Sequence, residues 1–133
     1  ALAMMGQQYK KGEGVKQSYE MAKRLYEQAA QQGDVGAMCN LGFMHEHGLG
    51  VERSHEKAFE YYEQAAQLGY AEAQCNLGLM YATGQGVTQD FLKAKEWWTA
   101  SAAQGNENAI KNLQILEKKM KKNMTKNATK NTK

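Results

Sequence analysis

Several features that mark particular protein classes are missing from this 133-residue sequence. It has no proline, so no proline break interrupts the helices predicted below, and its two cysteines do not demand an oxidising compartment. No run approaches the roughly 18 consecutive apolar residues that a membrane-spanning helix needs, which predicts that no segment spans a membrane. A signal-peptide pattern is also missing at the start, but Ala1 aligns with the interior of a repeat, so this absence decides nothing about a leader.

Charge is unevenly distributed along the chain. The net charge is +3, but the seven lysines after Glu117 carry +7 with no acidic residue, which leaves −4 on residues 1–117. Such a change of composition separates a folded body from a basic tail. Residues 123–133 are rich in lysine, asparagine and threonine and have little apolar surface to bury, so we expect them to be flexible.

One short motif occurs three times at a constant spacing. Gly48, Gly50 and Val51 recur 36 residues earlier and 36 residues later, and alanine, leucine and aromatic positions keep the same step. A period of this length indicates a solenoid, in which each unit buries its apolar face against its neighbours. We place the array at 1–122, with units at 1–36, 37–72 and 73–108 and a terminal helix at 106–122. This helix has Gln114 where glycine is expected, and it resembles a capping helix.

Apolar spacing predicts two helices in each unit. The first, helix A, has its stripe in the second unit at Ala37, Leu41, Met44 and His45. The second, helix B, has its stripe at Ala58, Tyr62, Ala65 and Ala66. Ser54 is the expected N-cap of helix B, and the two glycines of the repeated motif suit the turn that joins A to B. The expected fold class is therefore all-α.

These motifs resemble the Sel1-like repeat, a relative of the tetratricopeptide repeat. The resemblance rests on Ala-x-x-Asn-Leu-Gly-x-Met-Tyr/His-x-x-Gly-x-Gly-Val, followed by Lys-Ala-x-x-Tyr/Trp-Tyr/Trp and a terminal Ala-Ala-x-x-Gly, over 37–69 and 73–105. It covers nearly all of 1–113. It implies a right-handed α-solenoid that scaffolds protein complexes, as in bacterial exported or host-interacting proteins and in eukaryotic signalling or quality control. The compartment stays undecided.

A cysteine-rich branch of that family is similar in detail and joins each helix B to the next helix A by a disulfide. Cys39 and Cys75 match one half of that bridge, whereas Ala30 and Ala66 stand at the other half, so the bridge cannot form here. The two cysteines occupy one repeat position, and we expect reduced, half-buried packing residues rather than a disulfide.

Motifs that would carry catalysis or metal binding have structural explanations here. The Gly-x-Gly turn lacks the lysine of a phosphate loop and follows no strand. His45 and His47 lie two residues apart, which places them on different helix faces, and position 45 is Tyr9 and Tyr81 in the other units, so His45 is expected to replace a core aromatic residue. We therefore predict no enzyme activity, no cofactor and no metal.

The side of helix A opposite Leu41 is the candidate binding surface. In tetratricopeptide-like solenoids this side lines the concave groove. Turning 100° per residue and moving by one unit gives these candidate partner-binding residues: Asn40, Phe43, His47, Asn76, Leu79, Thr83, Asn112 and Ile115. Their counterparts in the first unit are Met4, Gln7 and Lys11, and Lys119 follows in the last helix. The asparagines offer a donor and an acceptor to a peptide, and the apolar residues offer side-chain contacts. The alternative is that both rows pack against neighbouring helices.

The favoured function is a non-enzymatic scaffold or adaptor that binds a peptide or a partner surface. One alternative is an enzyme or a cell-wall-ligand-binding protein of the cysteine-rich branch. Another is attachment to nucleic acid or to an anionic membrane through the basic tail, although no nucleic-acid partner is expected. A longer repeat protein or a multiprotein complex would suit the same pattern.

Overall fold

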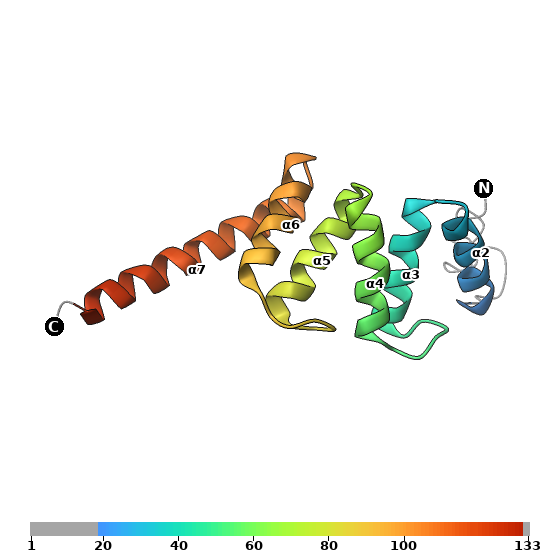
Figure 1. The fold of residues 1–133 in the computed structure, drawn as a ribbon, viewed down its shortest axis with the longest axis horizontal. Coiled ribbons are helices and arrows are strands. Elements are labelled where there is room, and N and C mark those ends of the chain that lie inside the picture. Colours follow the sequence, from blue (N-terminus) through green and yellow to red (C-terminus); the bar gives the residue numbers. More distant parts are fainter. Residues whose placement is uncertain (1–18, 132–133) are drawn as a thin grey trace.

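The structure, a computed structural model, describes residues 19–131, with side chains described for 19–122. It contains helices and turns over this range. The helices are α2 (Tyr19–Gln31), α3 (Val35–His47), α4 (His55–Gln67), α5 (Ala71–Thr83), α6 (Phe91–Ala103) and α7 (Glu107–Asn131). Helices α3, α5 and α7 are A helices, and α2, α4 and α6 are B helices. Each helix packs on its neighbours in the chain, so the helices stand side by side in a row (Figure 1).

Each helix begins and ends where the local chemistry favours it. The side chains of Ser54 and Asp90 accept hydrogen bonds from backbone N–H groups in the first turns of α4 and α6, so both are N-caps. Helices α3 and α5 end at Gly48 and Gly84, whose φ values of 67° and 73° are left-handed. The cap predicted at Ser54 is confirmed. Ser18, at the equivalent position of the first unit, lies outside the described residues.

The core depends on large aromatic side chains that pack against glycine. Tyr62 on α4 is fully buried, and a Cβ added to Gly42 on α3 would lie 2.7 Å from Cε1 of Tyr62. Trp98 on α6 is packed in the same way, with its Cδ1 2.6 Å from a Cβ added to Gly78. Its indole N–H also donates to the carbonyl of Cys75 at 3.0 Å. Glycine therefore sets the spacing between helix A and helix B of one unit.

Side-chain amides link consecutive units. Gln74 on α5 donates to the carbonyl of Ala66 at the end of α4 at 3.1 Å. Gln104, just after α6, donates to the carbonyl of Gly69 at 2.8 Å and to the side-chain oxygen of Gln74 at 3.1 Å. Two of these bonds supply a donor to backbone carbonyls at or just after the end of α4. They tie the end of one helix B to the unit before it.

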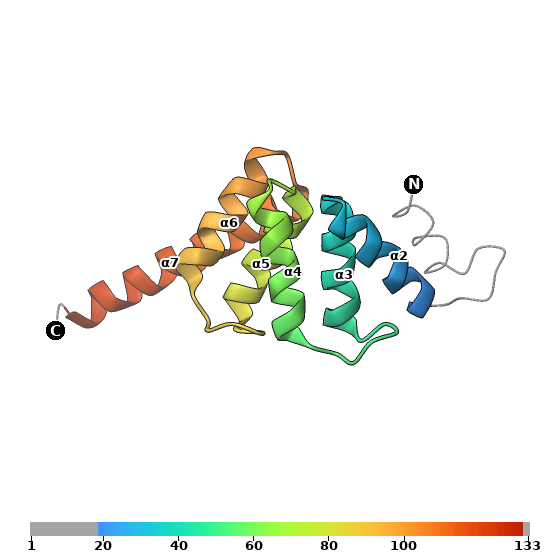
Figure 2. The same ribbon diagram turned by 45° about the vertical axis from the view of Figure 1, so that its right-hand side comes forward.

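Helix α7 covers one end of the array. Ala109 and Leu116 are buried against the neighbouring helices, and Leu113 and Met120 pack partly against them. Beyond these contacts α7 projects from the row (Figure 2). The sequence predicts that this helix ends near Lys122, whereas in the structure it continues to Asn131. Residues 106–133 contain neither glycine nor proline, and lysine is a good helix former, so nothing local ends the helix. The flexibility expected of 123–133 stays a prediction.

No helix in the part of the chain that the structure describes is both long enough and apolar enough to cross a membrane.

Candidate partner-binding surface

The predicted site residues lie on three successive A helices. We call the set the A-helix row: Asn40, Phe43, His47, Asn76, Leu79, Thr83, Asn112 and Ile115. The apolar members of the row are open to solvent, with exposed fractions of 38% for Phe43, 46% for Leu79 and 53% for Ile115. On the opposite side of α3 and α5, Leu41 and Leu77 are buried. Helices α3 and α5 thus each have one side buried in the core and an opposite side, with the residues of the row, that is open to solvent.

The asparagines of the row are partly buried. Asn112 on α7 donates from Nδ2 to the sulfur of Cys75 on α5 at 4.0 Å. This contact is of the kind expected if the asparagines hold the helices together. The N–H and C=O groups of each side-chain amide that are not used in such a contact would bind the backbone of a peptide ligand.

His47 and Thr83, the polar residues of the row at the ends of α3 and α5, contact residues of their own helices. His47 makes a ring contact with Phe43, with centroids 4.2 Å apart, and its Nε2 lies 3.8 Å from Oε1 of Glu46. Thr83 donates its hydroxyl hydrogen to the carbonyl of Leu79 at 2.9 Å. Met4, Gln7 and Lys11, the predicted counterparts in the first unit, lie outside the described residues.

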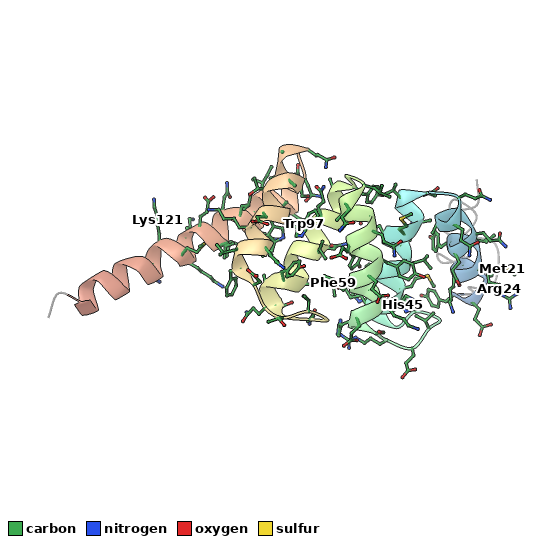
Figure 3. All side chains as sticks on the ribbon, in the orientation of Figure 1. Met21, Arg24, His45, Phe59, Trp97 and Lys121 are labelled. Atoms are coloured by element: carbon green, nitrogen blue, oxygen red, sulfur yellow. The ribbon has the colours of Figure 1, made fainter. Side chains whose placement is uncertain are left out.

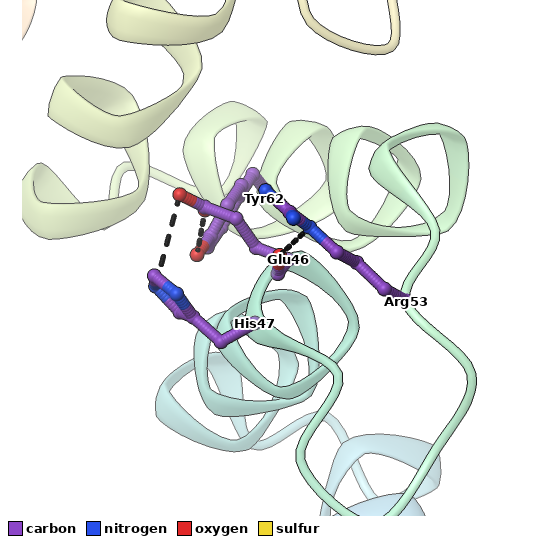
Figure 4. Close-up of polar contacts among 4 residues, drawn as sticks. All are labelled: Glu46, His47, Arg53 and Tyr62. Carbon is purple, nitrogen blue, oxygen red and sulfur yellow. Dashed lines mark hydrogen bonds and ion pairs between the residues drawn. The ribbon is translucent and has the colours of Figure 1, made fainter.

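Glu46 organises the end of α3 in a way that the sequence analysis did not predict. Tyr62 donates its hydroxyl hydrogen to Oε2 of Glu46 at 2.7 Å, and the Nε of Arg53 donates to the carbonyl of Glu46 at 3.0 Å (Figure 4). Burial, together with this hydrogen bond to a carboxylate, raises the pKa of Tyr62. The phenol therefore stays protonated as a donor, and it fixes Glu46 beside His47.

His45 lies on the other side of α3 and faces a cleft between α2 and α4 (Figure 3). It is buried and stacks on Tyr61 with ring centroids 5.6 Å apart, as expected for a residue that replaces a core aromatic. The cleft has a volume of about 290 Å³ and is also lined by Lys23, Glu27 and Lys57. Burial first, and then the charges of Lys57 and Lys23, lower the pKa of His45 below its ordinary 6.5.

We expect this histidine to make the array less stable in mild acid. Because the pKa of His45 is lower in the folded state, the unfolded chain binds the proton more readily, and stability falls as the pH drops below about 6.5. His45→Tyr, which copies Tyr81 of the next unit, should lose less stability than the parent between pH 7.5 and pH 5. Thermal melts at both pH values measure this loss.

His47→Gln is the control, because His47 is exposed on the same helix. It removes a histidine outside the cleft, so a smaller pH dependence in His45→Tyr than in this variant traces the effect to position 45. An equal loss of melting temperature in parent and His45→Tyr would show that His45 does not cause the effect.

The cysteines have no features of a catalytic or metal-binding pair. Cys39 and Cys75 form no disulfide, as predicted, and both are buried rather than half-buried. Burial raises the pKa of Cys75, with a smaller contribution from Glu72, which is the reverse of what a nucleophilic thiolate needs. Among the described residues, no group of three or more His, Cys, Asp or Glu side chains is placed to hold a metal ion.

Comparison with known proteins identifies the repeat. The Sel1 repeat family model matches residues 1–34, 35–70 and 71–106. A crystal structure of a Sel1 repeat protein from Oxalobacter formigenes is 39% identical with a TM-score of 0.78, and the match covers 86% of each chain. A search of curated proteins found no match.

Two further solved structures are similar. One is c5321, a protective antigen of uropathogenic Escherichia coli with this repeat fold, at 39% identity and a TM-score of 0.82. That match covers 90% of this chain and 26% of c5321. The other is cysteine-rich protein B of Helicobacter pylori, at 23% identity, a TM-score of 0.69 and 72% coverage of both chains, which shows a shared fold.

The second and third matched repeats begin two residues before the predicted units, at the first residues of α3 and α5. They confirm the predicted all-α solenoid and its period of about 36 residues. Proteins built from these repeats are generally non-catalytic scaffolds for protein interactions. The chain belongs to the Sel1 repeat family.

Proposed function

We propose that this protein is a non-enzymatic scaffold that binds a peptide or an extended partner segment along the A-helix row. The observation that carries the proposal is the exposure of Phe43, Leu79 and Ile115 at one repeat position on successive A helices. Aligned apolar side chains at a regular spacing suit side chains of an extended ligand or one face of a helix. The neighbouring asparagines suit the ligand's backbone, since an amide both donates and accepts.

The double variant Phe43→Ala with Leu79→Ala tests this assignment. We expect its affinity for a partner captured with the intact array to fall by about tenfold or more, because truncation of anchor side chains at an interface typically costs over 1 kcal/mol each. The melting temperature should change little, since both side chains are substantially exposed. Binding is measured by calorimetry with the purified partner.

Leu68→Ala is the matched control, because Leu68 is exposed but lies after α4, outside the row. It should bind the partner like the parent. Core truncations cost about 2–5 kcal/mol each. If the double variant loses stability on that scale, the row is packing and the assignment is wrong.

A further inference from the structure

An aromatic pair fills the junction between the second and third units. Phe59 on α4 meets Tyr81 on α5 edge to face, with ring centroids 5.5 Å apart. The ammonium group of Lys93 lies 5.5 Å from the centroid of the Tyr81 ring. Phe59 therefore sits in the middle of the array as a wedge between units (Figure 3), and a cation completes the arrangement.

The same two positions at the next junction carry charged residues. Thirty-six residues after Phe59 and Tyr81 the chain has Lys95 on α6 and Glu117 on α7. A cavity of about 430 Å³ lies here, lined by Lys95, Gln114, Glu117, Lys118, Met120 and Lys121. The junction thus lacks the aromatic wedge that its neighbour has.

On α6, the turn before Lys95 carries two exposed apolar residues. Leu92 precedes Lys95 by three residues on α6 and is 66% exposed, and Phe91, also exposed, precedes it by four. Residues with this spacing lie on one side of a helix. The positions equivalent to Leu92 in the other B helices hold Glu20 and Glu56. The repeat pattern itself therefore does not require an apolar residue here.

We propose that the α6–α7 cavity binds an acidic segment of a protein partner that inserts an aromatic side chain where Phe59 and Tyr81 stand at the preceding junction. The lysine stems and Met120 supply apolar walls, and the ammonium groups of Lys95, Lys118 and Lys121 face carboxylates and the ring. This second surface is separate from the A-helix row, and the proposal does not depend on the proposed function.

The cavity favours a protein segment over a phosphate backbone or a membrane. Glu117 lies among the lining lysines and would repel any anion inside the hollow, whereas an uncharged ring can pack beside it and leave the carboxylates of the segment at the rim. Single lysine–carboxylate pairs at an exposed site contribute little, so the selective part of the binding has to come from filling the hollow.

The test uses the full chain and a fluorescein-labelled peptide with one phenylalanine between two pairs of glutamates. Anisotropy titration should show binding that weakens with salt and that falls about tenfold or more when the phenylalanine is replaced with alanine. The key variant is Lys95→Phe with Glu117→Tyr, which rebuilds the aromatic wedge inside the chain. It removes one positive and one negative charge, so the net charge of +3 is unchanged. We expect at least a tenfold loss of peptide binding and a rise of about 3–5 °C in melting temperature.

A second pair of variants keeps the test decisive if the double variant does not fold. Lys118→Gln with Lys121→Gln removes two lysines that line the cavity, whereas Lys119→Gln with Lys122→Gln removes two exposed lysines of α7 that do not. Both pairs remove the same charge, so the first pair should weaken peptide binding more than the second.

Four results would overturn the proposal. These are no binding of the peptide, equal binding by the wedge variant and the parent, equal losses in the two lysine pairs, and tighter binding of duplex DNA or phosphatidylserine vesicles that the wedge variant leaves intact. The last result would show that the lysines of α7 attract polyanions in general.

Discussion

Gly86→Val is expected to destabilise the array by about 3 kcal/mol or more, which exceeds most single substitutions. Gly86 has a φ of 73°, where a β-branched residue is strained. A Cβ added at Gly86 would also collide with the carbonyl oxygen of His55 at the start of α4. That oxygen belongs to the backbone of the preceding unit and cannot rotate away. Urea denaturation of the parent and the variant measures the loss.

Gly36→Val is the matched control, and it should stay within about 1 kcal/mol of the parent. Gly36 lies in α3, and a Cβ there would have Asp34 Oδ1 at 3.4 Å and the Tyr70 hydroxyl at 3.7 Å as its nearest neighbours. Gly50→Val should behave like Gly86→Val, because Gly50 has a φ of 71° and an added Cβ would collide with Tyr19. Similar midpoints for all three variants would contradict this account of the turn.

Tyr62→Ala should cost about 3–5 kcal/mol, because it removes the fully buried ring that fills the space above Gly42. The loss includes the ring contacts with helix A of the same unit and the hydrogen bond to Glu46. Thermal and urea unfolding of the purified variant give its size.

Tyr62→Phe separates these two contributions. It keeps the ring and removes only the hydroxyl, so it should cost about 1–2 kcal/mol. Glu46 is only partly buried, which lets water replace part of the lost bond. If the two variants unfolded at the same midpoint, the hydrogen bond and not the packing of the ring would be what Tyr62 contributes.

The fold could be predicted because the same spacing of apolar residues and glycines recurs in every unit. An apolar stripe such as that from Ala37 to His45 indicates one face of a helix, whatever packs against it. Helix A and helix B could therefore be predicted directly from the sequence. The exact start of helix A depends on a cap, which the apolar stripe does not indicate. Asp34 accepts a hydrogen bond from the backbone N–H of Ala37, which places the beginning of α3 at Val35.

Exposure along the A-helix row followed from helix geometry, but contacts between helices did not. The bond from Tyr62 to Glu46 joins residues 16 apart on two helices, and no pattern within either helix indicates it. The α6–α7 cavity did leave a signal in the sequence. Lys95 and Glu117 stand where the preceding unit has Phe59 and Tyr81, and a position-by-position comparison of the units would have shown the change.

The succession of helices also bears on how the chain reaches its structure. The main contacts join helices that are neighbours in the chain, and even the bond from Asn112 to Cys75 spans only 37 residues. A chain with such local contacts closes short loops at every step, so its folding barrier is low and folding can start in any unit and spread to the next. Whole units can therefore be gained or lost in evolution without the need to reorganise the contacts of the units that remain.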